Sequence, residues 1–466
     1  MNLLKAISLH SNYRPLGGDL LKLFQLSIVE EVGQAEVVSA FKSQGYYRHL
    51  KADLKNRLLD GIFLSSFKEL TAIQHTHFKI QKRNLESKML IQSDQRIAGV
   101  TIAEETVANA EKYGLVEIVY TLSRDLEIIY AVNKNETRKY QKYKRKVAIY
   151  LKYLRQETTA QSLFAELAHC IQRKKDTSHI LAAIEVLRSW TFENSQYKFR
   201  FYYYSVRNLY ARLHNDHAQI IKICKEAAAF FSQSTTILPY TTEWSFRFQM
   251  LPVYLTQKAY GDAAVCIKKI LHLPSKGSYN WHLTLLYKAV LGFYSNRRGV
   301  VIQAYNEAES IKKKLSAEVI YERWKIVGAY LALFGKAGQL HFPAEFRTYR
   351  FVNDTKPNGT AKINMRILEL LHLLLDDKRK VYMNRVETIE QYISTNCKGK
   401  PRAKYFLRML RAVEDGDYNA LRVEAHAKKH QDLLKRTAST ININVLDSEP
   451  VPYPILWDLV MDHLRP

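Results

Sequence analysis

Residues 199–231 read FRFYYYSVRNLYARLHNDHAQIIKICKEAAAFF, and this stretch decides the fold because it contains two helical patterns separated by a polar break. In the first pattern, large apolar side chains recur every three or four residues, which is the spacing of one face of an α-helix. They are Phe199, Tyr203, Val206, Tyr210 and Leu213. After Asn215 and Asp216 the same spacing resumes with Ile220, Ile223, Cys224, Ala227, Phe230 and Phe231. The stretch therefore predicts two antiparallel helices joined by a tight turn.

The same plan recurs along the chain, which makes the helix pair a repeating unit. A further helix is marked by Trp244, Phe248, Leu251 and Tyr254, and its partner follows at 263–271 after a break at 258–261. Units begin near Lys198, Trp244, Tyr279, Glu318, Ala361 and Arg402, about 35 to 46 residues apart. Tetratricopeptide (TPR) repeats have a period of about 34 residues, so the units are TPR-like without matching the motif. We predict an all-α fold, an α-solenoid of TPR-like antiparallel helix pairs forming a right-handed superhelix.

Helix pairs are also predicted before residue 199. Residues 100–132 form one pair, with Gly114 at the turn, where a helix end favours a left-handed residue. Separate helices are expected at 136–156, 158–174 and 177–191. Residues 1–65 are predicted to be an N-terminal helical cap, and residues 66–438 the helical-repeat array, interrupted at about 340–360.

Residues 439–466 change in character and are predicted to be an extended tail that docks on the array. Residues 441–445 alternate like a strand, and three prolines stiffen the following chain. The apolar residues Trp457 and Leu459 are expected to anchor this tail to the helices.

Four segments resemble a family of uncharacterised bacterial TPR-like proteins. They are the pair at 199–231, the linker at 346–353, the helix at 367–375 and the PYPILW segment at 452–457. The resemblance covers most of residues 65–466. It implies a TPR-like fold and a bacterial protein, and it implies no activity, ligand or catalytic residue.

The composition points to a basic intracellular protein. Lys and Arg number 70 against 45 Asp and Glu, a formal net charge of +25, which speeds encounters with any anionic partner. The four cysteines show no CxxC spacing, which disfavours a zinc or redox motif and fits a reducing compartment. Because no secretory signal and no apolar run long enough for a membrane span is evident, we predict a cytoplasmic protein without membrane contact.

Two basic clusters are the candidate sites for an anionic partner. Residues 137–156 contain eight Lys or Arg and no acidic residue, with a buried stripe expected at Tyr140, Val147, Tyr150 and Leu154. The exposed cations of this helix are Lys139, Lys142, Arg145, Lys146 and Lys152. The second cluster, at 398–411, contributes Lys404, Arg408 and Arg411. Such cations could hold phosphates, although a charged helix face is more often only the solvated side.

No motif for catalysis or cofactor binding is present. The chain has no Gly-rich phosphate loop, no HExxH and no G-x-S-x-G. His426 and His430 share a helix face, but Lys428 and Lys429 lie between them, so surface histidines are the simpler interpretation. We therefore predict a non-enzymatic scaffold without cofactors that binds a protein or peptide partner. The alternative is a nucleic-acid-binding helical-repeat protein that contacts the phosphate backbone through its basic helices; an enzyme with a dispersed site has no supporting feature.

Overall fold

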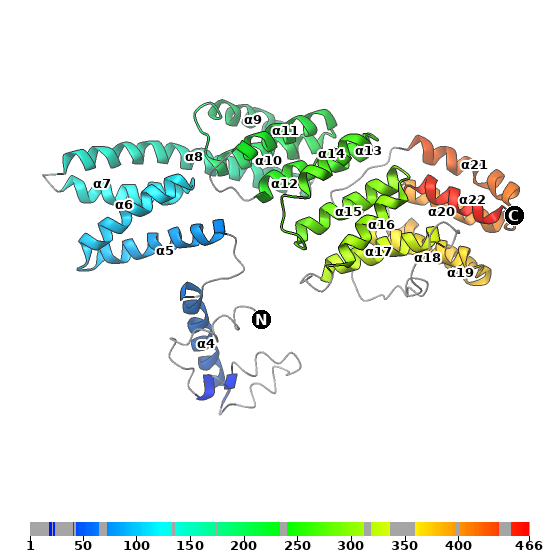
Figure 1. Ribbon diagram of the computed structural model, residues 1–466, viewed down its shortest axis with the longest axis horizontal. Coiled ribbons are helices and arrows are strands. Elements are labelled where there is room, and N and C mark those ends of the chain that lie inside the picture. The colour runs from blue at the N-terminus through cyan, green and yellow to red at the C-terminus, as the bar shows by residue number, and fades with distance from the viewer. Residues whose placement is uncertain are drawn as a thin grey trace. The chain divides into compact units, whose positions relative to one another are not determined.

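The computed structural model describes residues 18–20, 22–23, 41, 43–64, 72–132, 136–173, 175–233, 240–311, 318–335, 359–396, 401–437 and 449–465. Throughout this part of the chain every regular element is a helix (Figure 1), which confirms the all-α fold class. No helix within it is long and apolar enough to cross a membrane. The predicted interruption, apart from its last residues, and the strand-like segment at 441–445 lie outside the described residues, as does most of the predicted cap.

The chain divides into two compact units, which we call the N-terminal unit (Met1–Gln156) and the C-terminal unit (Glu157–Pro466). The N-terminal unit contains α4 (Gln44–Leu64), α5 (Ala72–Gln92), α6 (Arg96–Lys112), α7 (Val116–Ala131) and the first part of α8 (Thr137–Arg173). Helix α6 packs against both α5 and α7. At Gly99 the backbones of α5 and α6 are so close that a Cβ atom would lie 2.7 Å from the backbone nitrogen of Ile91.

Helix α8 differs from the prediction of two helices, at 136–156 and 158–174. It is a single helix of 37 residues. Its sequence contains neither Gly nor Pro, and the β-branched pair Thr158-Thr159 weakens a helix only slightly. The polar stretch around residue 157 was therefore wrongly interpreted as a turn.

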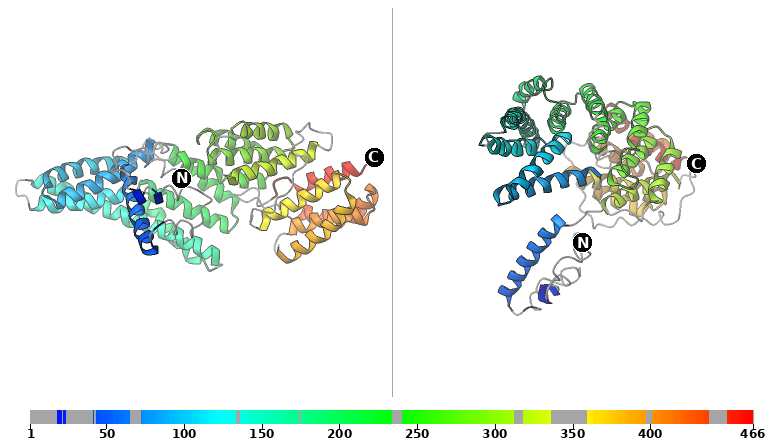
Figure 2. Two further views of the ribbon diagram at one scale, coloured as in Figure 1. Left: turned by 90° about the horizontal axis from the view of Figure 1, so that it is seen from below. Right: turned by 60° about the vertical axis from the view of Figure 1, so that its left-hand side comes forward.

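The C-terminal unit contains the rest of α8 and fourteen further labelled helices in its described part. They are α9 (Ser178–Trp190), α10 (Tyr197–Leu213), α11 (His217–Gln233), α12 (Tyr240–Phe248), α13 (Leu251–Thr256), α14 (Tyr260–Ile270), α15 (Tyr279–Tyr294), α16 (Arg298–Glu309), α17 (Glu318–Phe334), α18 (Gly359–Leu375), α19 (Arg379–Asn396), α20 (Pro401–Asp415), α21 (Ala420–Arg436) and α22 (Tyr453–Leu464). From α9 to α21 most helices pack against the next one in the chain (Figures 1 and 2). Contacts also join helices two apart in the chain order: α11 contacts α13, α13 contacts α15, and α15 contacts α17.

The helix predicted from Trp244 to Tyr254 is broken into α12 and α13. Pro252 lies in the first turn of α13. A proline ring clashes with the carbonyl four residues earlier, here that of Phe248, and proline has no N–H to donate. The helix therefore ends at Phe248 and starts again at Leu251, a break that Pro252 could have predicted.

One turn geometry closes six of the helix pairs. After α6, α10, α13, α15, α18 and α20 a residue with positive φ follows the helix: Gly114, Asn215, Lys258, Asn296, Asp377 and Asp417. In each turn the next N–H bonds to the carbonyl five residues before it, as in Arg297 N to Gly292 O at 2.8 Å. This is the Schellman motif, which satisfies carbonyls left unpaired at a helix end. In the C-terminal unit these turns lie about 40 residues apart, with about 80 between Asn296 and Asp377.

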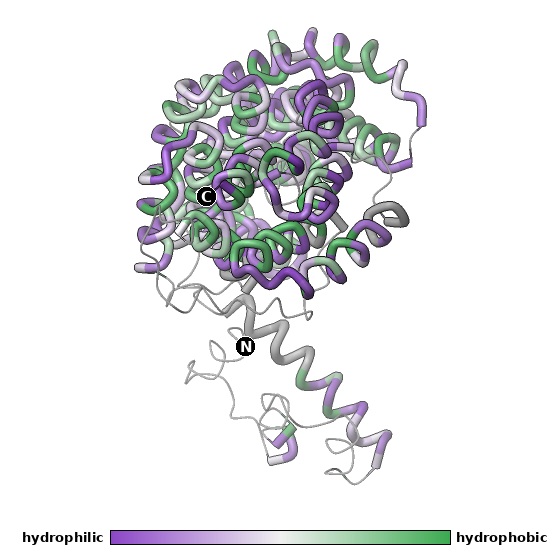
Figure 3. Tube along the Cα trace, turned by 90° about the vertical axis from the view of Figure 1, so that its right-hand side faces the viewer, coloured by the Kyte–Doolittle hydropathy of each residue, from purple (hydrophilic) through white to green (hydrophobic). Residues whose placement is uncertain are grey.

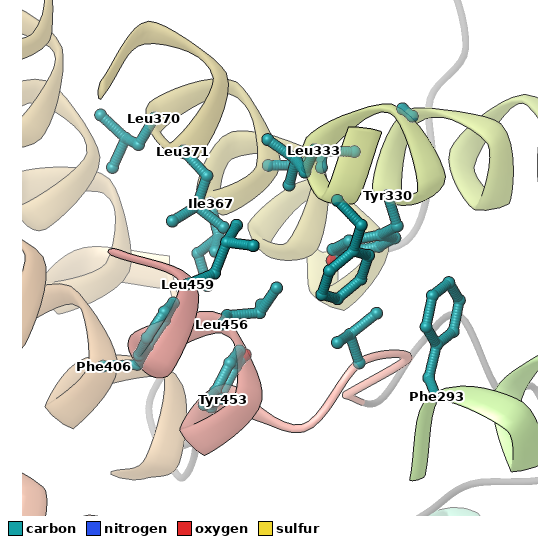
Figure 4. Close-up of a cluster of buried hydrophobic side chains, with 14 of the residues drawn as sticks. Phe293, Tyr330, Leu333, Ile367, Leu370, Leu371, Phe406, Tyr453, Leu456 and Leu459 are labelled. Carbon is teal, nitrogen blue, oxygen red and sulfur yellow. The ribbon is translucent and has the colours of Figure 1, made fainter. Parts of the chain in front are cut away.

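Most helices of the C-terminal unit bury an apolar stripe, whereas α13, α15 and the second half of α17 are buried on nearly all sides. Figure 3 shows hydrophobic and hydrophilic residues interspersed along these helices. Tyr203 and Tyr204 of α10 are buried, whereas Tyr202 is half-buried. Helix α22 lies against α18, and its Tyr453, Leu456 and Leu459 belong to the same apolar cluster as α17, α18 and α20 (Figure 4). The rings of Tyr453 and Phe406 stack with centroids 4.6 Å apart.

A buried ion pair joins α20 to the segment that precedes α22. Both carboxylate oxygens of Glu449 accept hydrogen bonds from Arg402, at 2.8 and 2.9 Å. Arg402 also donates to the carbonyls of Leu434 and Thr437. The backbone N–H of Tyr453 donates to the carboxylate of Glu449 at 2.6 Å. The hydroxyl of Tyr294 donates to the backbone carbonyl of Glu449, also at 2.6 Å. Glu449 thus connects α15, α20 and α22.

Candidate functional site

Two of the five predicted cations of α8 are engaged within the N-terminal unit. The ammonium of Lys139 lies 3.5 Å from the carboxylate of Glu104 and 3.3 Å from the hydroxyl of Tyr130. Lys146 pairs with Glu111. Because Glu104 and Glu111 both belong to α6, these two lysines tie α8 to α6, and part of their charge is neutralised.

The inward face of α8 includes residues of the predicted stripe, together with Tyr143, which the prediction did not include. Tyr143 is buried, and the four half-buried residues of the predicted stripe share its helix face, with Tyr140 and Tyr150 packed against the same cluster. The hydroxyl of Tyr143 donates to Glu104 at 3.3 Å, and burial, followed by the charge of Glu104, raises its pKa.

The remaining cations of α8 are exposed. Lys142 lies over the Tyr143 ring, with its ammonium 5.2 Å from the ring centre. Arg145 and Lys152 are exposed as well. Of the five predicted cations of α8, these three are therefore the exposed ones.

The second basic cluster lies on α20, in the C-terminal unit. Arg411 pairs with Glu390 of α19 at 2.7 Å, and Arg408 lies 4.0 Å from the same carboxylate. Lys404 is exposed. Glu390 therefore lies at ion-pair distance from two of the three predicted cations of this cluster.

Chemistry by thiols or metals finds little support in the described residues. No group of three or more His, Cys, Asp or Glu side chains is placed there to hold a metal ion. Burial lowers the pKa of His430, helped by the charges of Arg408 and Lys429. Burial also raises the pKa of Cys224 to about 12 and that of Cys266 to about 11. Both thiols are therefore protonated at neutral pH and poor nucleophiles.

A groove of about 540 Å³ runs along α10, between α9 and α11. Its α10 wall is formed by Tyr203, Arg207, Tyr210, Ala211 and His214. Residues 203 to 214 of a helix span about 16 Å, which is the length of five extended residues or three helical turns of a partner. We call this feature the α9–α11 groove.

The α9–α11 groove combines aromatic rings with charges of both signs. Arg207 donates to Glu226 at 2.8 Å, and its guanidinium lies 5.1 Å from the centre of the Tyr203 ring. Arg188 pairs with Glu185 at 3.4 Å, and the rings of Tyr210 and His214 are 4.5 Å apart. On the α9 side Leu181 is 52 % exposed. A wall of this mixed character suits a polypeptide better than a polyanion.

A second cavity, of about 570 Å³, lies between α14, α15 and α16. Its apolar wall includes Ile267, Leu271 and Leu291, and its polar rim includes Lys268, Lys288 and Arg297. We call it the α14–α16 cavity. It lies entirely within the C-terminal unit.

Neither hollow was predicted from the sequence. Tyr210 packs partly against the apolar cluster, as predicted, and also lines the groove, whereas Leu213, assigned to the same stripe, is exposed. The available signal was Arg207 and His214, two polar residues that share a face of the helix with Tyr203 and Tyr210. Which neighbouring helices flank that face depends on tertiary packing.

No protein-family model, curated protein or solved structure matches this chain. The resemblance to a bacterial TPR-like family therefore stays a prediction.

Proposed function

We propose that this protein is a non-enzymatic, cytoplasmic interaction scaffold that binds a segment of a partner protein in the α9–α11 groove. The proposed architecture is an α-solenoid of TPR-like pairs with a right-handed superhelix. Two features support it: the shared turn geometry, which recurs about every 40 residues in the C-terminal unit except for one interval of about 80, and the packing of helices against their neighbours in the chain. Repeat proteins of this kind bind partners on surfaces formed by successive helices.

The α9–α11 groove is the observation that carries the proposal. Its three walls come from consecutive helices, its length fits a short peptide, and its side chains include Tyr and Arg, which are enriched in binding hot spots. Its acidic residues Glu185, Asp216 and Glu226 balance its cations Arg188, Arg207 and Lys222, so the groove offers a phosphate backbone no net attraction. A peptide with both apolar and charged side chains matches this wall.

Selection from a displayed library of 12-residue peptides on the immobilised full chain tests the proposal. We expect enriched peptides that bind in the micromolar range and lose at least tenfold in affinity with Leu181→Glu. The matched control is Leu421→Glu, an exposed leucine of α21 that does not line the groove. Equal binding by the two variants would exclude the groove, and a selection without enriched peptides would contradict the scaffold.

The alternative, backbone-driven nucleic-acid binding, rests on the net charge and on the exposed Lys142, Arg145 and Lys152 of α8. Binding to labelled single- and double-stranded oligonucleotides across a salt series tests it, because each neutralised phosphate steepens the salt dependence. Steep binding that Lys142→Glu and Arg145→Glu abolish, with no peptide retained, would replace the scaffold by this function. Lys146 is left unchanged in this test because its pair with Glu111 ties α8 to α6.

A further inference from the structure

The α14–α16 cavity differs from the α9–α11 groove in the charge of its wall. Among the described residues that line it, Lys268, Lys288 and Arg297 are cationic and none is acidic. Lys268 and Arg297 are exposed, and within the described part of the chain neither has a carboxylate at ion-pair distance. Lys288 lies 3.8 Å from Glu307, which does not line the cavity. The rim is thus a cluster of cations with little local compensation.

The groove provides a comparison within the same unit. There Arg207 and Arg188 each face a glutamate at 2.8 and 3.4 Å, so positive charge is locally balanced. The high Lys and Arg content of this protein therefore does not explain why the α14–α16 cavity has no acidic residue among its described lining residues. In the α14–α16 cavity the positive potential is available to a bound group.

The cavity also offers apolar contact directly beside these charges. Ile267, Leu271 and Leu291 lie in its wall, and the Tyr294 ring at its edge is held by the hydrogen bond to the Glu449 carbonyl. A volume of about 570 Å³ falls within the range of about 300–1,000 Å³ typical of small-molecule sites. The first turns of α14 and α16, at Gly261 and Val300, line it as well and add a smaller positive contribution.

We propose that the α14–α16 cavity binds a small organic anion, a carboxylate or phosphate ester carried on an apolar body. The anionic group lies between Lys268 and Arg297, where the guanidinium can offer two parallel N–H donors. The apolar body lies against the leucine and isoleucine wall. This site does not depend on the α9–α11 groove or on its partner.

Isothermal titration of the full chain with three naphthalene probes tests the proposal. The probes are 2-naphthyl phosphate, 2-naphthoate and the uncharged 2-naphthol, in a phosphate-free buffer of low ionic strength at pH 7. We expect at least one anion to bind with submillimolar affinity, and 2-naphthol to bind at least tenfold more weakly. The order of the two anions identifies the preferred head group.

Two variants locate the site. The double substitution Lys268→Gln/Arg297→Gln should weaken the anion at least tenfold and leave 2-naphthol unchanged. Its control is Lys428→Gln/Lys429→Gln on α21, which removes the same charge from exposed positions outside the cavity and should have a much smaller effect. Ala264→Trp, which fills the cavity without changing charge, should abolish binding of the anion.

Several results would overturn the proposal. They are no binding of either anion, equal binding of 2-naphthol, an equal loss in the control pair, or unchanged binding in Ala264→Trp. Circular dichroism of each variant shows that the helical fold is retained.

Discussion

Removing the carboxylate of Glu449 tests whether the buried pair with Arg402 holds α22 in place. In Glu449→Ala, Arg402 loses two charge-assisted hydrogen bonds and Tyr453 N–H loses its acceptor. The Arg402 side chain is only 16 % exposed, so water cannot easily replace the lost partner. We expect the variant to weaken the docking of α22 on α18 and α20.

The expected cost follows from the burial of both partners. Breaking a buried ion pair by removing one member costs about 3–5 kcal/mol, because the other charge stays buried without its partner. The backbone carbonyls of Leu434 and Thr437 still accept from Arg402, which favours the lower end, about 3 kcal/mol. The double variant Arg402→Ala/Glu449→Ala leaves neither charge unpaired and should cost less than the sum of the single variants.

Tryptophan fluorescence during urea denaturation measures these differences, because all five Trp lie between residues 190 and 457, in the C-terminal unit. The matched control is the double-mutant cycle of Arg411 and Glu390, a pair of 2.7 Å whose side chains are 47 % and 33 % exposed. Its coupling energy should be about 0–1 kcal/mol. If both cycles give the same coupling energy, or if Glu449→Ala costs less than about 1 kcal/mol, the reasoning from burial fails.

Two further predictions concern a turn and a buried histidine. Lys258 has a φ of 58°, a left-handed conformation that costs a residue with a side chain about 1–2 kcal/mol. Glycine removes this strain, but it loses more conformational entropy on folding, which costs about 0.5–1 kcal/mol. Lys258→Gly should therefore raise the free energy of unfolding by about 0.5–1 kcal/mol. The control Asn215→Gly should change it little, because asparagine tolerates the left-handed conformation. A lower free energy of unfolding in Lys258→Gly would show that the turn is not strained. Burial lowers the pKa of His282 to about 4, so between that value and the ordinary 6.5 the unfolded chain binds more protons, and stability falls as pH decreases. Urea denaturation at pH 7 and pH 5 should show a loss of about 2 kcal/mol that is absent in His282→Gln, and an equal loss in the variant would exclude His282 as its cause.

The helical class and many helix bounds were predictable because apolar spacing repeats with the period of a helix. The stretch at 199–231 contains α10 and α11 almost as predicted, and Gly114 has the expected left-handed conformation. The recurring turn was harder to identify, because its other members are Asn, Lys and Asp in place of glycine. Their conformation accompanies the Schellman hydrogen bonds, which cannot be predicted from any single residue type.

The surface was less predictable than the core. Eight basic residues were singled out by local charge alone, and four of them, Lys139, Lys146, Arg408 and Arg411, lie near glutamates of other helices. The local sequence gives the charge of one helix, but it does not predict which acidic residues a neighbouring helix places beside it. The same limit explains why the two hollows were missed, since each is formed by three helices.

The hydrogen bond from Tyr294 to Glu449 links residues 155 positions apart, whereas most helices contact a neighbour in the chain. At a translation rate of about 5–20 residues per second, Tyr294 is synthesised roughly 8 to 30 seconds before Glu449. During that interval α15 to α18 can fold locally, but the apolar surface that α22 covers stays open to solvent. A nascent chain of this protein therefore passes through a stage at which Ile367 and Leu371 are accessible to chaperones, and the arrival of α22 ends that stage.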